Sequence, residues 1–197
     1  DPSGRHEFSG IDKQPQSFID VAAPGPHYGD GSGVRGDIIG DTQHHGGNDK
    51  AIYAYAREEL DYWQSELSRP LASGCFGENL TTQGVDLSAL LINQRLRIGT
   101  AVLEVSVPRQ PCSTFAGWLG ERGWLKRWTA RGDCGTYLRI ISPGRIQPGD
   151  CITMDAPPNH DITMRIAFAA KMGNRTLAQR VIEAGCLPPH QNNSLRA

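Results

Sequence analysis

The chain has 197 residues, and its 20 Lys and Arg against 21 Asp and Glu give a formal net charge of −1. This length predicts one compact domain, or one with a small appendage. The balanced charge argues against nucleic-acid binding, which needs clustered basic residues, and against an electrostatic membrane anchor. In addition, no apolar run approaches the roughly 18 residues of a membrane span. From the charge and the lack of such a run together, we expect neither a nucleic-acid nor a membrane partner.

Five cysteines lie at wide spacings, without any Cys-x-x-Cys pair. An odd number of cysteines in a chain of this size does not suggest a disulfide framework. We therefore expect a cytoplasmic protein with reduced thiols.

The first half of the chain predicts short strands followed by a helix. Residues 1–47 are rich in glycine, and the apolar pairs at 18–19 and 38–39 are strand candidates between turns. From Ile52 to Leu67, apolar residues recur at spacings of four, four, three and four. This periodicity predicts one amphipathic helix over 48–67, with Asn48 or Asp49 as its N-cap.

The second half of the chain predicts more strands and then a change from strand patterns to helical patterns. Residues 96–107 alternate as a hairpin that turns at Gly99-Thr100. A helical pattern over 115–128 is weakened by glycines, and strands are expected over 135–141 and 151–155. Two short helices follow over 163–172 and 176–184, with Asn174 as a cap and Gly185 as a stop.

These elements predict a mainly β, barrel-like fold with a few helices. The β domain is expected over residues 10–155 and a small helical extension over 159–187. Residues 1–9 and 188–197 are expected to be flexible termini.

Four glycine- or proline-bearing loops carry the side chains that can perform chemistry. They are Gly10 to Lys13, His44 to Lys50, Phe76 to Leu80, and Pro108 to Cys112. None of them is a generic phosphate-binding motif.

Cys112 follows the second strand of the hairpin, where Pro108 and Pro111 stiffen the backbone. Arg109, three residues earlier, could hold an anion or stabilise a nearby thiolate. The alternative is that Cys112 is an ordinary buried cysteine.

His45, Gly46 and Gly47 precede the expected helix, whose N-terminal amides would offer an anion site to which Lys50 could add charge. The alternative is a set of surface or capping residues. In the third loop, Glu78 could exchange protons, Asn79 could hydrogen-bond a ligand, and Gly77 supplies flexibility. A plain turn is the competing interpretation of that loop.

Taken in this order, the loops resemble the MOSC domain family, named for the C-terminal domain of molybdenum cofactor sulfurase, and most closely its stand-alone bacterial branch. The matching stretches are Gly10-Ile11-x-Lys13-x-Pro15, Gly36-Asp37, His45-Gly46-Gly47-x-Asp49-Lys50-Ala51, Phe76-Gly77-Glu78-Asn79-Leu80, Glu104-Val105-x-x-Pro108-Arg109-x-Pro111-Cys112, Gly135-x-Tyr137 and 144–150.

The resemblance implies a molybdenum cofactor, a pterin dithiolene that carries Mo, with Cys112 as the protein ligand to the metal. A soft thiolate suits molybdenum in a sulfur-rich coordination sphere. The resemblance further implies reduction of N-hydroxylated compounds, such as hydroxylaminopurines, to amines.

The expected roles of the other loop residues follow from the same resemblance. His45, Gly46, Gly47, Lys50, Gly77 and Arg109 would bind the cofactor, Glu78 would donate a proton, and Asn79 would face the substrate. Electrons would come from a separate reductase, because the chain has no sequence signature for flavin, haem or an iron–sulfur cluster.

Two alternatives stay open at this stage. One is a carrier that stores molybdenum cofactor, or that moves sulfur as a persulfide on Cys112, without turnover. The other is an inert barrel. Although pyridoxal phosphate is a term used for the wider family, no lysine here has the setting of a Schiff base, so we expect none bound. The oligomeric state is left open.

Overall fold

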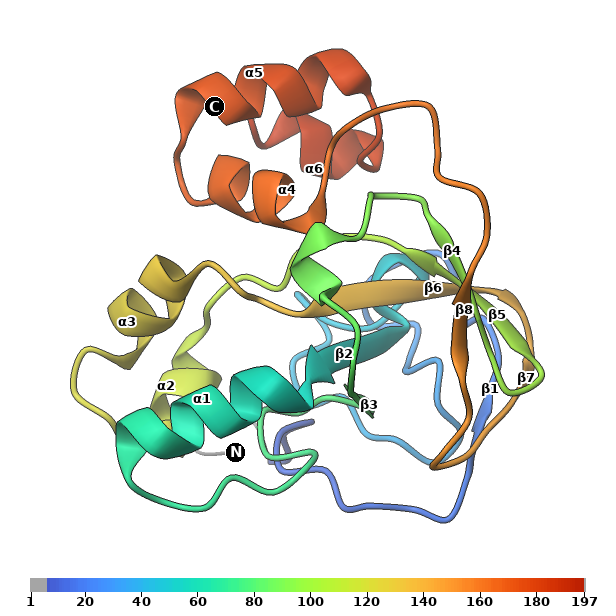
Figure 1. The fold of residues 1–197 in the computed structure, drawn as a ribbon, viewed down its shortest axis with the longest axis vertical. Coiled ribbons are helices and arrows are strands. Elements are labelled where there is room, and N and C mark those ends of the chain that lie inside the picture. The colour runs from blue at the N-terminus through green and yellow to red at the C-terminus, as the bar shows by residue number, and fades with distance from the viewer. Residues whose placement is uncertain (1–6, 197) are drawn as a thin grey trace.

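The computed structural model describes residues 7–196. A six-stranded sheet curls into half a barrel, a two-stranded sheet lies beside it, and the helices gather on one side and at one end (Figure 1). The mainly β, barrel-like fold is confirmed in this form.

The strands are β1 (Ile19–Val21), β2 (Ile52–Ala56), β3 (Leu80–Thr82), β4 (Arg95–Ile98), β5 (Ala101–Val105), β6 (Thr136–Ser142), β7 (Gly144–Ile146) and β8 (Ile152–Met154). The helices are α1 (Arg57–Leu67), α2 (Ser113–Leu119), α3 (Trp124–Arg131), α4 (Met164–Lys171), α5 (Arg175–Ala184) and α6 (Pro189–Asn193), with single 3-10 turns η1 (Asn48–Lys50) and η2 (Leu87–Ala89). The large sheet has the order β3-β2-β6-β5-β4-β8, and β1 pairs with β7. Among the strands of residues 7–196, β2 and β3 form the one parallel pair.

The single helix predicted over residues 48–67 is wrong. Residues 52–56 form β2, in which every residue is buried between β3 and β6, and α1 begins only at Arg57. A central strand buried on both faces is a continuous apolar run, so the helical spacing from Ile52 to Ala56 was coincidental.

The hairpin is confirmed, with Ile98 paired to Ala101 across the turn. The strands expected over 135–141 and 151–155 are confirmed as β6 and β8. In the first 47 residues β1 forms at 19–21, whereas residues 38–39 form no strand and Ile38 is exposed.

The helical pattern over 115–128 is divided into α2 and α3. Gly120 and Gly123 both adopt left-handed conformations, with φ of 65° and 71°, so the helix ends and restarts there. Trp63, Trp124 and Trp128 are buried among α1, α2 and α3. Trp124 meets Trp63, Phe76 and Phe115 edge to face, and Trp128 meets Phe115 in the same way.

Helices α4 to α6 lie at one end of the sheet (Figure 1). The predicted caps are confirmed: Asn174 accepts a hydrogen bond from the Leu177 amide at 3.1 Å, and Gly185 ends α5. Residues 189–193, expected within a flexible terminus, form α6. The Asn93 side chain donates to the Cys186 carbonyl at 2.8 Å, which ties these helices to the sheet.

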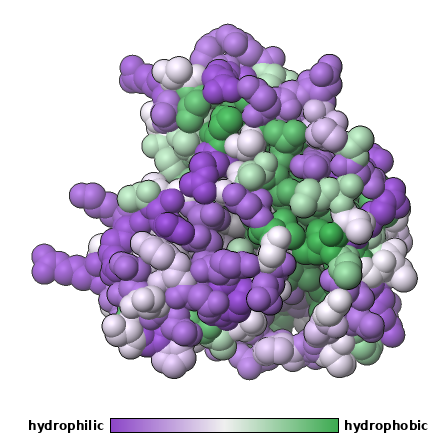
Figure 2. All heavy atoms as spheres, viewed as in Figure 1, coloured by the Kyte–Doolittle hydropathy of each residue, from purple (hydrophilic) through white to green (hydrophobic). Residues whose placement is uncertain are grey.

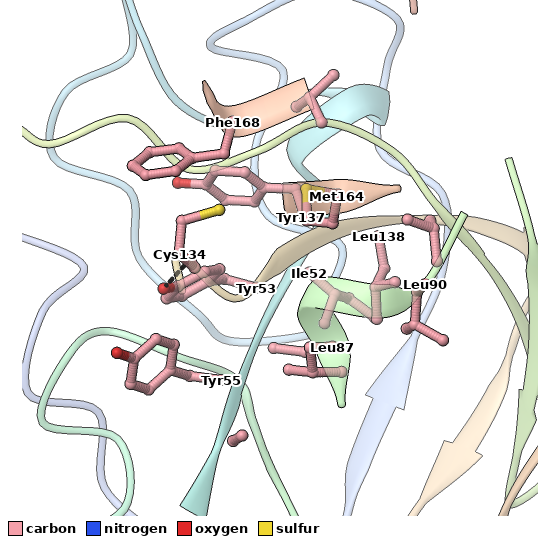
Figure 3. Packing of buried hydrophobic residues seen from close by; sticks show 14 of the residues in the cluster. Ile52, Tyr53, Tyr55, Leu87, Leu90, Cys134, Tyr137, Leu138, Met164 and Phe168 are labelled. Atoms are coloured by element: carbon pink, nitrogen blue, oxygen red, sulfur yellow. Dashed lines mark hydrogen bonds between the residues drawn. The ribbon is translucent and has the colours of Figure 1, made fainter. Parts of the chain in front are cut away.

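The core continues from the sheet into α4. Figure 3 shows Ile52 of β2 and Leu138 of β6 packed near Leu87 and Leu90, with Phe168 of α4 above Tyr137 and Met164 of α4 beside it. Between residues 7 and 196, no helix is both long and apolar enough to pass through a bilayer.

Candidate functional site

A cavity lies where the loops singled out in the sequence converge. Its volume is about 100 Å³, and it opens to solvent. The predicted site residues that line it are His45, Gly46, Lys50, Gly77, Asn79, Arg109 and Cys112. Gly47 and Glu78 are not among the lining residues.

Cys112 lies between β5 and α2, as the residue that precedes the first turn of α2. Its thiol is half-buried. None of the five cysteines of the chain forms a disulfide. No other cysteine lines the cavity. A thiol in this position can therefore ligate a group bound in the cavity.

Arg109 is a buried cation without a buried anionic partner. Its side chain is buried, donates to the Phe76 carbonyl, and lies with its guanidinium carbon 4.2 Å from the Phe115 ring centre. Within residues 7–196 no carboxylate forms an ion pair with Arg109, which lines the same cavity as Cys112. Because an unpaired buried charge is costly, this position favours binding of an anion.

Lys50 adds a second positive charge to the same wall. Its ammonium donates to the His44 carbonyl at 2.6 Å and lies 4.6 Å from the Tyr28 ring centre. Burial lowers the pKa of Lys50 to about 8, so the side chain stays mostly charged at neutral pH.

His45 is not a third cation. Burial, with the positive charges of Lys50 and Arg109 next in effect, lowers the pKa of His45 to about 4. The ring is therefore neutral at pH 7, with Nδ1 at 3.3 Å from the Tyr137 hydroxyl. A neutral imidazole can hydrogen-bond a ligand or a ring hydroxyl without charge.

Gly46 and Gly47 shape the loop beside His45. Their φ angles are 80° and 72°, and a Cβ at Gly47 would lie 2.2 Å from the His27 carbonyl oxygen. Only glycine fits there. The helix N-terminus expected after this loop is absent, because the loop leads into the single 3-10 turn η1, so the predicted amide-based anion site is wrong.

Glu78 faces its own loop. Glu78 is 2% exposed, and its carboxylate accepts hydrogen bonds from the Gly74 amide at 2.6 Å, the Phe76 amide at 3.0 Å and the Thr81 hydroxyl at 3.1 Å. Burial raises the pKa of Glu78. This geometry favours a structural role, in which Glu78 holds the loop against β3.

Asn79 lines the cavity but uses both ends of its amide within the protein. Its Oδ1 accepts from the Tyr53 amide at 3.0 Å, and its Nδ2 donates to Asp37 at 2.9 Å. Asp37 also binds the Lys13 ammonium and the Ser32 hydroxyl. Asn79 thus connects β2 to a polar cluster at the cavity wall.

Sequence reasoning gave no site role to Lys13, Asp37, Tyr53 or Tyr137, all of which line the cavity. Lys13, Asp37 and Tyr137 lie in stretches that resemble the family, so the resemblance could have identified them as site residues. No sequence pattern identified Tyr53 as a site residue, because it lies on β2, which was predicted to be helical.

Among residues 7–196, no group of three or more His, Cys, Asp or Glu side chains is placed to hold a metal ion. A metal held by this cavity therefore needs most of its ligands from a cofactor, with Cys112 as the protein ligand. The cationic wall and single thiol fit an anionic, metal-bearing cofactor.

Comparison with known proteins supports a family assignment. Residues 41–153 match the MOSC domain. The uncharacterized protein YflK of Bacillus subtilis (strain 168) is 40% identical over 155 residues, which cover 77% of this chain and 70% of YflK. Protein YiiM of Escherichia coli (strain K12) is 31% identical over 117 residues, covering 58% of this chain and 52% of YiiM.

A protein named "Reductase" from Gibberella moniliformis (strain M3125 / FGSC 7600) is 31% identical over 135 residues, which are 66% of this chain and only 24% of that protein. This chain thus spans about half of YiiM and a quarter of the fungal protein.

Solved structures agree with the sequence relatives. YiiM from Geobacillus stearothermophilus superposes with a TM-score of 0.68 at 28% identity, covering 76% of this chain and 78% of that one. YiiM from Escherichia coli gives 0.74 at 22% identity, covering 97% and 89%, and shares the fold. The chain therefore belongs to the MOSC domain family.

Proposed function

We propose that this protein binds a molybdenum cofactor and reduces N-hydroxylated compounds, such as hydroxylaminopurines, to amines. The observation that carries the proposal is the buried Arg109 guanidinium, which lacks an anionic partner in the described chain and lines the same cavity as the Cys112 thiol. An anionic, thiolate-ligated cofactor would satisfy both groups.

The residues present fit such a cofactor. Cys112 would hold the metal, while Arg109 and Lys50 would bind the phosphate and dithiolene charges. Neutral His45 and the Tyr137 hydroxyl can hydrogen-bond the pterin, and the glycines at 46 and 77 let backbone approach it.

The cofactor, when bound, supplies the two-electron reduction. The balanced reaction is R–NH–OH + 2 e⁻ + 2 H⁺ → R–NH₂ + H₂O, in which the N–O bond breaks and the hydroxyl leaves as water. We assign Lys13, rather than Glu78, to hydrogen-bond the leaving hydroxyl, because its ammonium lines the cavity and is held by Asp37.

Electrons would come from a separate reductase. The name of the fungal relative, "Reductase", supports redox chemistry in a protein that includes a similar region. The five free thiols support a reducing, cytoplasmic location.

The test is elemental analysis of protein produced in cells that make molybdenum cofactor. Wild type should hold near-stoichiometric molybdenum, and Cys112→Ala should lose it, whereas the control Cys151→Ala, which changes an exposed cysteine, should keep it. Wild type should also reduce 6-hydroxylaminopurine with a reductase. Full molybdenum content and turnover in Cys112→Ala would overturn the assignment.

The carrier alternative gives a different result in the same preparation. It predicts bound cofactor, or labile sulfane sulfur on Cys112, without turnover of any N-hydroxylated compound. The half-buried position of Cys112 in an open cavity is compatible with sulfur exchange. Sulfane sulfur and turnover of the N-hydroxylated compound should therefore be measured on the same preparation.

A further inference from the structure

A second, larger hollow adjoins the cofactor cavity. It is a groove of about 1300 Å³ between β3, the two-stranded sheet β1–β7 and the start of β8. On the face seen in Figure 2, hydrophobic side chains gather in the same region of the molecule, between the positions of β3 and β8 in Figure 1. Leu80, Ile98 and Ile152 are among its apolar lining residues.

The groove and the cavity share one wall. Lys13, Asp37 and Asn79 line both. These three side chains are fixed by hydrogen bonds to one another, with Asn79 Nδ2 at 2.9 Å from Asp37. A molecule in the groove can therefore reach the cavity at a point where polar groups hold a defined geometry.

The two hollows differ in charge. The cavity is lined by the basic residues Lys13, Lys50 and Arg109 against the acidic residues Asp37 and Asp41. Among the described residues, the acidic side chains that line the groove are Asp12, Asp20, Asp37, Glu78 and Asp150, and the basic ones are Lys13 and Arg35. Asp20 is paired with Arg145 at 2.8 Å and Asp37 with the Lys13 ammonium. The remaining carboxyl groups of Asp12, Glu78 and Asp150 outnumber Arg35, so the groove has no surplus of positive charge.

We propose that this groove is the substrate site and that it takes uncharged N-hydroxylated bases or nucleosides in preference to their 5′-phosphates. The proposal rests on the proposed function. A planar base can lie against the aliphatic wall with its N–OH group at Lys13, and the volume leaves room for a sugar. A phosphate would lie among carboxylates and would be repelled.

The first test fills the groove. Ile152→Trp places a large ring on its wall, and Thr153→Trp is the matched control, because Thr153 is the next residue of β8, is exposed and does not line the groove. With molybdenum content unchanged in both, Ile152→Trp should raise KM for 6-hydroxylaminopurine at least tenfold, and Thr153→Trp should not. Cys151→Trp, at an exposed lining residue, is the second variant if Ile152→Trp misfolds. Equal KM values in the lining variant and the control would overturn the proposal.

The second test compares ligands. Wild type should have a kcat/KM at least tenfold higher for the N-hydroxylated nucleoside than for its 5′-monophosphate, and the double variant Asp12→Asn, Asp150→Asn should narrow this ratio. A monophosphate used as well as the nucleoside would contradict the charge argument.

Failure of the proposal can be told apart from failure of the proposed function. If the wild type holds no molybdenum, binding of adenine, the expected product, is measured calorimetrically on the cofactor-free protein. Adenine binding lost in Ile152→Trp but kept in Thr153→Trp would support the groove on its own. Adenine binding unaffected by either variant would reject it.

Discussion

The guanidinium carbon of Arg109 lies 4.7 Å from the centre of the Tyr53 ring, so this buried cation is held by an aromatic face rather than by a carboxylate. The Tyr53 hydroxyl donates to the Cys134 carbonyl at 2.8 Å, which fixes the ring (Figure 3). A cation held in this way keeps its capacity to bind an anion that enters the cavity.

Arg109→Met should separate stability from binding. Because it removes an unpaired buried charge, we expect the free energy of unfolding of the cofactor-free protein to rise by about 1–3 kcal/mol, while bound molybdenum falls. Urea unfolding and elemental analysis measure the two effects. Arg127→Met, at an exposed ion pair with Glu66, should change stability by less than about 1 kcal/mol; a large loss of stability in Arg109→Met alone would contradict the prediction.

Glu78→Gln tests the structural role of this carboxylate. Since the amide side chain cannot accept all three hydrogen bonds, the free energy of unfolding should fall by about 1–3 kcal/mol. Turnover per bound molybdenum should stay near the wild-type value. A loss of about 10²–10⁴-fold, the range expected for a general acid, would restore Glu78 as the proton donor.

Lys13→Met tests whether Lys13, rather than Glu78, hydrogen-bonds the leaving hydroxyl group. Turnover per bound molybdenum should fall about 10²-fold or more, because no ammonium then meets the leaving hydroxyl, and molybdenum content should stay constant. Lys126→Met, on the surface of α3, is the control. Steady-state rates normalised to metal content decide the matter, and unchanged turnover in Lys13→Met would remove Lys13 from the mechanism.

Gly47→Ala should lower the free energy of unfolding by more than the positive φ angle of Gly47 alone predicts. Both Gly47 and Gly173 have positive φ, but a Cβ would meet the His27 carbonyl at 2.2 Å in the first case and nothing within 4 Å in the second. Gly173→Ala should therefore cost about 1–2 kcal/mol, and Gly47→Ala more, with loss of molybdenum. Equal destabilisation of the two variants would contradict the predicted clash.

Asp133 should make stability depend on pH. Burial, followed in effect by the nearby Glu59, raises the pKa of Asp133 from 3.8 to about 6 in the folded protein. Between pH 4 and 6 the folded state therefore binds more protons than the unfolded state, so the free energy of unfolding falls as pH rises, by about 2–3 kcal/mol from this group.

Asp133→Asn should remove that contribution, and Asp161→Asn, at an exposed side chain, should keep it. Because His45 titrates in an overlapping range in the opposite sense, the test is the difference between wild-type and variant unfolding curves at each pH. Parallel curves would contradict the prediction.

Local patterns predicted the parts of the fold that depend on local rules. The hairpin at Gly99-Thr100 and the Asn174 and Gly185 caps follow from turn and capping chemistry, and all are confirmed. Strand β2 was missed because burial on both faces removes the alternation that identifies a strand.

The site was predictable as a set of loops but not as a set of roles. The positions of Cys112, Arg109 and Lys50 in one cavity match the expectation. The role of Glu78 could not be read from the sequence, because its hydrogen-bond partners are two backbone amides and one hydroxyl that only the folded loop brings together.

The pairing of β1 with β7 has a consequence for the order of events during synthesis. Asp20 and Arg145, which face each other across these strands, are 125 residues apart in the chain. Strand β1, which lies between Lys13 and Asp37 in the chain, therefore cannot complete its pairing until residues 144–146 have left the ribosome. A bulky prosthetic group can accordingly be enclosed by the finished walls only after most of the polypeptide has been translated.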